Sequence, residues 1–364
     1  MPKLEKVISF LKDNTFFTFL LLYIKMRKLD VLIAGSTGYI GVQLVKLLLK
    51  HPNINIKYLC GNSSVGKNIS FFDSELKNKR LPKIVKLNKS YFNDVDIIFT
   101  ALPNGEAQIL SNQLLKKNIL IDLAADFRLE DPKEYNKWYK LKHKAIKNIS
   151  KSIYALPELC ENYLKKYKII ACPGCYPTSI LLPLLPLFKK NLIFHKNIII
   201  DSKSGYSGAG RDIHKITNKK KLHESLSAYG VGFHRHNSEI DQELSKINNN
   251  ISFTFTPHLS PMFRGLLSTI YIDLKNNIKP ITIQNVLKKF YRKKPFVKIS
   301  KFNIPIGTNS VINTNKCLIS VCKTKYKNKI IILSAIDNLI KGGAGQAVQN
   351  MNIFFNFLET KGLK

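Results

Sequence analysis

Strand-like runs alternate with a helical pattern over the first half of the chain. The runs at Leu29–Ala34, Ile54–Leu59, Asp96–Ala101 and Leu120–Ala124 have the length and apolar character of buried strands. After the first run, apolar positions recur at helical spacing from Ile40 to Leu48. This alternation predicts an α/β fold, a Rossmann-type doubly wound parallel sheet.

The pattern changes beyond residue 175. Residues 197–202, 252–256 and 266–274 read as strands with polar ends and few helices between them. Long strands of this kind predict a second α+β domain with a mixed sheet. Just before this change, the Lys-, Tyr- and Asn-rich segment 133–150 is expected to be a solvated excursion.

The N-terminal segment carries a short apolar run, Phe16 to Ile24. It is too short to cross a bilayer, which takes roughly 20 residues. Residues 25–28, three of them basic, follow it where a signal peptide would have small ones. We therefore expect no membrane partner, a working protein that starts near Met26, and an extension at 1–25 that is disordered or not native.

The net charge of +34 changes the picture only slightly. Such a surplus can indicate a nucleic-acid partner. The lysines are scattered, however, and cationic runs reach only three residues, as at 219–221. A drift in composition is favoured over a nucleic-acid-binding patch, and the basic nucleic-acid binder is kept as the non-enzyme alternative.

The 6 cysteines are spread along the chain without a dense framework. Their spacing to histidines does not suggest zinc, so no metal is expected. Few, scattered cysteines favour a reducing compartment, and the cytoplasm is the predicted location.

A glycine-rich turn follows the first strand. Its residues are Gly35, Ser36, Thr37, Gly38, Tyr39, Ile40 and Gly41. Between a strand and a helix, such glycines let the backbone approach a pyrophosphate that the helix N-terminus attracts. The turn is predicted to bind a dinucleotide, although a plain structural turn has the same spacing.

The end of the second strand favours NADP over NAD. An NAD site usually has an acid there for the ribose 2′-hydroxyl. Here the strand runs into small polar groups, Ser63 and Ser64, with Lys67 nearby. These residues suit a 2′-phosphate, and the alternative is an ordinary polar loop.

Cys175 follows a Pro-Gly turn and precedes an apolar helical run. At a helix start, unpaired N–H groups and the helix dipole stabilise a thiolate, which can attack an acyl carbon. The alternatives are an inert buried cysteine and a redox pair with Cys172.

Two further segments carry candidate chemistry. Ser204–Arg211, with Gly205, Ser207 and Gly208, follows a strand and could form an anion nest or a flexible turn. His234, Arg235, His236 and Glu239 form a cluster that could supply a base. If this segment is helical, Glu239 shares a face with His236 and could orient its ring.

Taken together, these motifs resemble the N-acetyl-gamma-glutamyl-phosphate reductases, arginine-biosynthesis enzymes in the wider class of semialdehyde and glyceraldehyde-3-phosphate dehydrogenases. The resemblance runs from about residue 28 to residue 352. It is carried by the segments 35–41, 121–129, 173–178, 204–211, 234–240, 255–265 and 337–352.

The resemblance implies a role for each group. Cys175 is the nucleophile, His236 the acid/base with Glu239 behind it, and His234 and Arg235 hold the substrate. The choice between the two histidines stays open. Arg128 and the loop 204–211 would handle the phosphoryl group, and Arg264 a substrate carboxylate. Asn338 and Gly342 would lie near the nicotinamide.

The resemblance also implies the reaction and the organisation of the chain. NADPH would reduce an acyl phosphate through a thioester on Cys175, with N-acetylglutamyl phosphate as substrate, another acyl phosphate being the alternative. The expected parts are an NADP-binding domain (26–174), a catalytic and dimerisation domain (175–334) and a C-terminal helix that returns to the first domain (335–364). A homo-oligomer, dimer or tetramer, is expected.

Overall fold

The computed structural model describes residues 28–211 and 224–363, so the predicted extension at 1–25 lies outside the described residues. The first half of the chain forms a parallel sheet of seven strands in the order β3-β2-β1-β4-β5-β7-β6. The strands are β1 (Leu29–Ala34), β2 (Ile54–Cys60), β3 (Ile84–Val85), β4 (Ile97–Thr100), β5 (Ile119–Asp122), β6 (Ser152–Tyr154) and β7 (Ile169–Ala171).

Alternation along β1 explains why both faces of this sheet are covered. Val31 and Ile33 pack in a core with residues of α2 (Tyr39–Leu49) and α12 (Gly345–Phe354). Leu32 and Ala34 point the other way, into a core with residues of α3 (Glu106–Ser111). Buried on both faces, the strand needs a nearly continuous apolar run. The predicted Rossmann-type sheet is confirmed.

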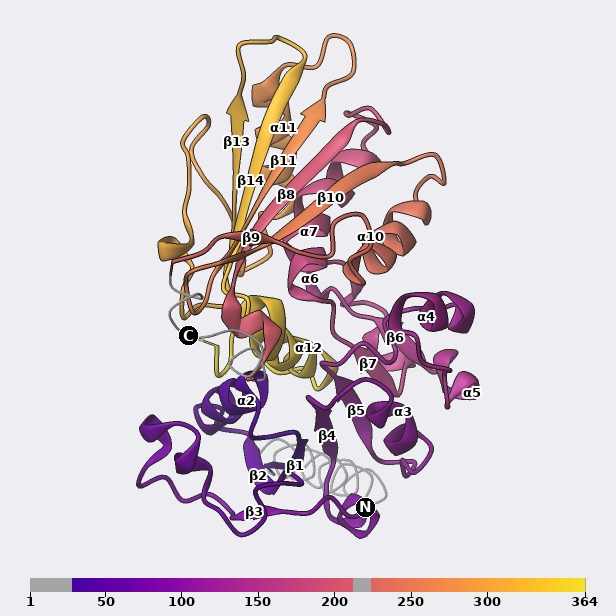
Figure 1. Ribbon diagram of the computed structural model, residues 1–364, viewed down its shortest axis with the longest axis vertical. Coiled ribbons are helices and arrows are strands. Elements are labelled where there is room, and N and C mark those ends of the chain that lie inside the picture. Colours follow the sequence, from indigo (N-terminus) through magenta and orange to yellow (C-terminus); the bar gives the residue numbers. More distant parts are fainter. Residues whose placement is uncertain (1–27, 212–223, 364) are drawn as a thin grey trace, which may run out of the picture.

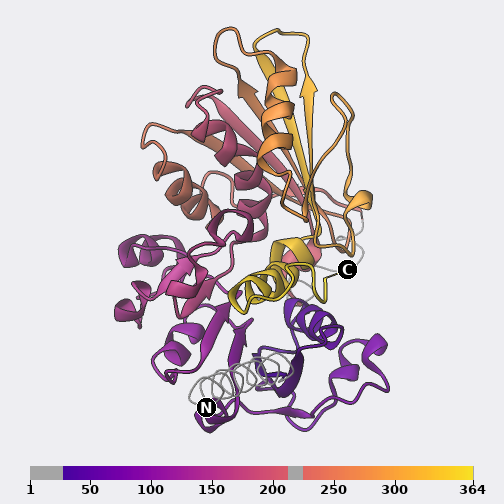
Figure 2. The same ribbon diagram turned by 180° about the vertical axis from the view of Figure 1, so that it is seen from behind.

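The second half forms a mixed sheet in the order β12-β13-β14-β11-β8-β10-β9, as predicted. Helices α7, α10 and α11 pack on one face, which Figure 2 shows, while Figure 1 looks onto the other face. The strands are β8 (Ile198–Gly205), β9 (Ser227–Ala228), β10 (Phe253–Ser260), β11 (Leu266–Asp273), β12 (Val297–Ile299), β13 (Cys317–Lys323) and β14 (Lys329–Ile336). The helices are α7 (Cys175–Lys189), α10 (His236–Ser245) and α11 (Pro280–Phe290).

The segment 133–150 is not the solvated excursion that its composition predicted. It forms α4 (Pro132–Tyr139) and α5 (Ile146–Ile149). Tyr135 is fully buried, and its hydroxyl donates to Asp126 Oδ1 at 2.7 Å. His143 is also buried and contacts the Tyr135 ring edge-on. The lysines of this segment lie on the outer side of a small aromatic core.

The end of the chain returns to the first domain. After β14, the backbone turns through a π-helical segment (Ile340–Ala344) into α12. Figure 1 shows α12 between the two sheets, and its Ala347, Val348 and Met351 belong to the core of the parallel sheet. β14 ends at Ile336, two residues past the predicted boundary, and the exact domain limits stay predictions.

Candidate active site

Cys175 is the first residue of α7 and lies where two cavities meet. Its side chain is a free, partly exposed thiol. One cavity, of about 440 Å³, is also lined by His234, Arg235 and His236. A smaller one, of about 200 Å³, joins Cys175 and His236 to Ile40 of the glycine turn. The sulfur is therefore between the histidine segment and the predicted cofactor site.

Gly174 fixes how the histidine approaches the cysteine. A Cβ atom on Gly174 would lie 2.5 Å from Nε2 of His236, so the imidazole packs directly on this backbone. On the other side, a Cβ atom on Gly342 would lie 2.6 Å from Cβ of Cys175. Two glycines without side chains thus let an imidazole and the C-terminal segment close in around the thiol.

The two histidines differ in what their ring nitrogens contact. Nδ1 of His234 accepts the backbone N–H of His236 at 3.1 Å, which places His234 at the start of α10. Nδ1 of His236 is buried and has no hydrogen-bond partner among the described residues. His236 lines both cavities, whereas His234 lines only the larger one. The geometry favours His236 for proton transfer.

The surroundings of Cys175 and His236 favour the neutral form of both side chains. Burial raises the pKa of the Cys175 thiol to about 11, although Arg128 and the backbone N–H of Tyr176 act to lower it. Burial and the neighbouring His234 and Arg128 hold the pKa of His236 well below 6.5. Burial therefore opposes the thiolate that the helix start was expected to stabilise, and the Cys175 thiol lines the same two cavities as the His236 imidazole.

This protonation state leads to an expected pH profile. Since the pKa of His236 is lowered, the imidazole stays unprotonated until well below pH 6.5. We expect kcat/KM to fall on the acidic side only well below pH 6.5. A histidine base with an ordinary pKa would reduce kcat/KM to half near pH 6.5. Steady-state kinetics across the acidic range measure this, and a midpoint at or above pH 6.5 would contradict the assignment.

Glu239 does not orient His236 as the sequence suggested. The helix forms, but the carboxylate oxygen lies 3.7 Å from Nε2, too far for a hydrogen bond. Instead, Glu239 is fully buried and accepts hydrogen bonds from Arg128 (2.9 Å), Tyr154 Oη (3.1 Å) and the backbone N–H of Gly174 (2.9 Å). It holds Gly174, the residue just before α7, so we assign it to positioning Cys175.

Arg128 belongs to the same buried network. Its Nε donates to the carbonyl of Cys172 at 2.7 Å, and Nη2 donates to the carbonyl of Leu123 at 2.9 Å. With Nη1 on Glu239, all three nitrogens are engaged by the protein. We therefore assign Arg128 to positioning and no longer to the phosphoryl group.

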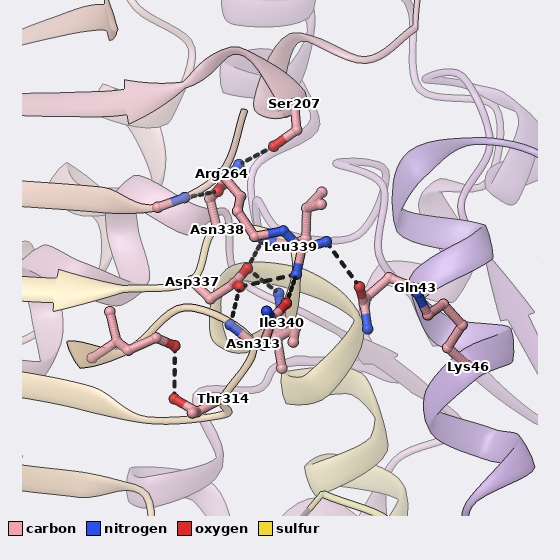
Figure 3. Close-up of polar contacts among 12 residues, drawn as sticks. Gln43, Lys46, Ser207, Arg264, Asn313, Thr314, Asp337, Asn338, Leu339 and Ile340 are labelled. Atoms are coloured by element: carbon pink, nitrogen blue, oxygen red, sulfur yellow. Dashed lines mark hydrogen bonds and ion pairs between the residues drawn. The ribbon is translucent and has the colours of Figure 1, made fainter. Parts of the chain in front are cut away.

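Arg264 has protein partners as well (Figure 3). Nη1 lies 3.2 Å from Asp337 Oδ2, and Nη2 lies 3.2 Å from Gln43 Oε1 in α2. It links the mixed sheet to the first domain, which argues against the predicted contact with a substrate carboxylate. Asn338 binds the Gly265 N–H at 2.8 Å and Ser207 Oγ at 2.9 Å, also shown in Figure 3.

Arg235 is the predicted arginine that remains available for an anionic substrate. It is exposed and lines both cavities beside Cys175. Ser204, Gly205 and Gly208 line the larger cavity, as the nest interpretation predicts. The sequence missed Trp138 and Tyr229, which complete its wall. Asp131 caps α4 and Pro132 opens it, a helix-start signal that could have located Trp138.

A third cavity, of about 670 Å³, lies over the glycine turn. Of the predicted cofactor residues, Gly35, Thr37, Gly38, Tyr39, Ile40, Gly41, Ser63 and Ser64 line it. Ser36 is buried and donates to the Cys60 carbonyl instead. Asn338 and Gly342 line the smaller cavity next to Cys175.

The glycine turn suits a dinucleotide on structural grounds. Gly35 has φ +81°, and a Cβ atom there would lie 2.2 Å from the Ala101 carbonyl oxygen. At Gly41 it would lie 2.2 Å from the Gly35 oxygen. Only a backbone without side chains packs this closely and leaves room above it. The residues present fit a nicotinamide dinucleotide.

Lys67 is not where a 2′-phosphate ligand would have to be. Its ammonium lies over the Phe71 ring, 4.5 Å from the centroid, and the residue lines a separate surface hollow. The chain leaves the cofactor cavity after Ser64, so Lys67 is close to Ser64 in sequence but does not line that cavity. Arg211, by contrast, lines the cofactor cavity together with Ser63 and Ser64.

Comparison with known proteins defines the family. The semialdehyde dehydrogenase NAD binding domain matches residues 30–167, and the semialdehyde dehydrogenase dimerisation domain matches residues 175–338. The N-acetyl-gamma-glutamyl-phosphate reductase of Desulforamulus reducens is 41% identical over 91% of this chain and 96% of its own length. The N-acetyl-gamma-glutamyl-phosphate reductase of Brachyspira hyodysenteriae is 43% identical over 92% of this chain and 98% of its own length.

The chain belongs to the N-acetyl-gamma-glutamyl-phosphate reductase family.

Solved structures place this reductase family in a wider fold group. Aspartate semialdehyde dehydrogenase II of Vibrio cholerae, complexed with ASA, superposes with a TM-score of 0.66 at 16% identity, covering 91% of this chain and 99% of that one. Aspartate semialdehyde dehydrogenase of Candida albicans, with NADP, gives 0.64 at 15% identity, covering 91% and 100%. At these identities the likeness concerns the two-domain fold alone.

Two absences apply to residues 28–211 and 224–363. No group of three or more His, Cys, Asp or Glu side chains there is arranged to hold a metal ion. Among the helices of the same residues, none has the length and apolar character needed to cross a membrane.

Proposed function

We propose that this reductase-family member converts N-acetyl-L-glutamyl 5-phosphate to N-acetyl-L-glutamate 5-semialdehyde and phosphate with NADPH, in L-arginine biosynthesis. The observation that carries the proposal is the position of Cys175. It lines both the larger cavity, with His236 and Arg235, and the smaller cavity that reaches Ile40 of the glycine turn. The relatives' names supply the substrate.

The reaction begins with a proton transfer inside the protein. His236 accepts the thiol proton of Cys175 as the sulfur attacks the acyl carbon, since the imidazole is neutral and packs on Gly174. The tetrahedral intermediate expels phosphate and leaves a thioester on Cys175. Arg235 and the backbone of the loop 204–208 are placed to bind the phosphoryl oxygens.

NADPH, when bound, supplies a hydride to the thioester carbon. The thiohemiacetal that results on Cys175 then collapses to the semialdehyde, and the proton held by His236 returns to the sulfur. Gly342 is needed beside Cys175, because any side chain at position 342 would meet the Cβ atom of Cys175.

The decisive assay runs the reaction backwards. Purified protein should reduce NADP only when N-acetylglutamate semialdehyde and phosphate are both supplied. Aspartate semialdehyde is the control substrate, because it lacks both the acetyl group and one methylene and tests the alternative of another acyl phosphate. Faster reduction with the control substrate, or reduction that ignores phosphate, would contradict the proposal.

A preference for NADP over NAD is part of the proposal. Ser63 and Ser64 line the cofactor cavity at the carboxyl end of β2, and no Asp or Glu lies between Cys60 and Ser64. A 2′-phosphate gains from hydroxyl donors, whereas a 2′-hydroxyl is usually held by an acid. The cytoplasm is the proposed location, since its reducing conditions keep cysteines such as those of this chain as free thiols.

We also propose that two copies associate through the face of the mixed sheet that Figure 1 displays. Ile199 and Tyr271 are paired across β8 and β11 and are 51% and 42% exposed there. Burying such a pair against its own copy would remove apolar area from water.

The double substitution Ile199→Lys, Tyr271→Glu should convert the oligomer to a 41.6 kDa monomer. Light scattering after gel filtration measures the mass. Phe71→Glu is the control, because Phe71 is exposed on the first domain, away from this sheet. An unchanged mass for the double variant, or a monomeric wild type, would overturn the proposed interface.

A further inference from the structure

The loop Ser204–Arg211 serves two cavities. Ser204 and Gly205 line the cavity beside Cys175, whereas Gly210 and Arg211 line the cavity over the glycine turn. Arg211 was expected to bind substrate phosphate, but neither cavity next to Cys175 includes it. Its role must therefore be sought on the cofactor side.

Arg211 is fixed in place by groups of the first domain. Nε donates to the Thr37 carbonyl in the glycine turn at 2.8 Å, and Nη2 donates to the Phe72 carbonyl at 3.4 Å. The guanidinium lies over the Tyr39 ring at 4.4 Å from the centroid. These contacts leave further N–H donors of its planar fork for a ligand in the cavity.

The surroundings of Arg211 point to one part of the dinucleotide. Ser63, Ser64 and Phe72, which follow β2, line the same cavity. In Rossmann-type sites the ribose 2′ position lies at the end of this strand, and an arginine accommodates a 2′-phosphate there. Among the described residues that line the cavity, Arg211 is the only lysine or arginine. Lys67, the cation expected from the sequence, lies elsewhere.

We propose that Arg211, supplied by the mixed-sheet domain, binds the 2′-phosphate of NADP together with Ser63 and Ser64. The residue that selects the cofactor then belongs to the same loop as the residues that line the substrate cavity. This inference rests on the proposed preference for NADP.

The test compares the affinities of four proteins for two cofactors by isothermal titration calorimetry. Arg211→Met keeps the aliphatic stem and removes the charge and the donors. We expect it to weaken NADPH binding roughly 10- to 100-fold, as for loss of hydrogen bonds to a charged group, and to leave NADH binding within about twofold. Arg211→Lys should fall between, since it keeps the charge without the fork.

Lys67→Met is the matched control and should bind both cofactors like the wild type. Thermal melting of each variant checks that it is folded. If Arg211→Met is not folded, Arg211→Lys still tests the proposal. A wild type that binds NADH as tightly as NADPH would overturn the NADP preference itself. If the wild type prefers NADPH, two results for Arg211→Met would overturn only the role of Arg211. In the first, the variant keeps the preference for NADPH; in the second, it loses affinity for both cofactors equally.

Discussion

Replacing Cys175 by serine should lower kcat at least about 10⁴-fold while the protein stays folded. Serine keeps the size of the side chain, but a hydroxyl is a far weaker nucleophile than a thiol whose proton His236 accepts, and losses of this order follow removal of a nucleophile. The assay is phosphate-dependent reduction of NADP with the semialdehyde. Near-normal turnover would end the thioester mechanism.

Cys172→Ala is the control for this experiment. Cys172 is three positions away but 1% exposed, and burial raises the pKa of its thiol to about 12. Both cysteines are free thiols in the structure. We expect Cys172→Ala to keep activity within a few-fold, and labelling by iodoacetamide with mass spectrometry to modify position 175 before position 172.

Glu239→Ala should produce the largest loss of stability of any single substitution at the site, about 3–5 kcal/mol in the free energy of unfolding. The change leaves the Arg128 guanidinium buried without its ion-pair partner, and it also removes the acceptor for the Gly174 N–H and the Tyr154 hydroxyl. Urea denaturation followed by circular dichroism measures the loss.

Glu130→Ala is the matched control for Glu239→Ala. Its carboxylate also pairs with a cation, Lys246, at 2.6 Å, but the side chain is 65% exposed. An exposed pair contributes only about 0–1 kcal/mol, so this variant should unfold almost like the wild type. Equal losses for the two variants would show that burial of the Arg128–Glu239 pair has no special effect on stability.

Sequence patterns predicted a structural feature correctly where neighbouring residues in the chain determine that feature. The apolar run 29–34 predicted β1 because a strand buried on both faces needs apolar side chains on both. The glycines of the turn were recognised because their spacing reflects close backbone contacts, as at Gly35 with Ala101. Cys175 was placed at the start of a helix because a Pro-Gly turn precedes an apolar run.

The roles of the arginines could not be predicted in this way. An arginine in the sequence indicates an anion or an acceptor, but not which one. The partner of Arg128 is 111 positions away, and that of Arg211 in the glycine turn is 174 positions away. The fold alone decides that Arg128 meets Glu239, that Arg264 meets Asp337, and that Arg235 is left to face the cavity.

Burial is the other property that the sequence did not reveal. The helix start was expected to ionise Cys175, yet enclosure by the histidine segment and Gly342 opposes the charge more strongly. In the segment 133–150, frequent lysines concealed a helix whose Tyr135 and Tyr139 are buried. Composition describes the surface of such a helix and says little about its inner side.

The return of the chain end has a consequence for biosynthesis on the ribosome. Ala347 and Met351 complete the core of a sheet whose first strand begins at residue 29, and Gly342 closes against a thiol made long before it. During synthesis, the N-terminal domain therefore cannot complete its core until the residues of α12 have left the ribosome. A premature stop codon shortly after Ile336 would give a protein with all the strands of both sheets. That protein would lack the helix that completes the core of the nucleotide-binding domain and the glycine that packs against Cys175.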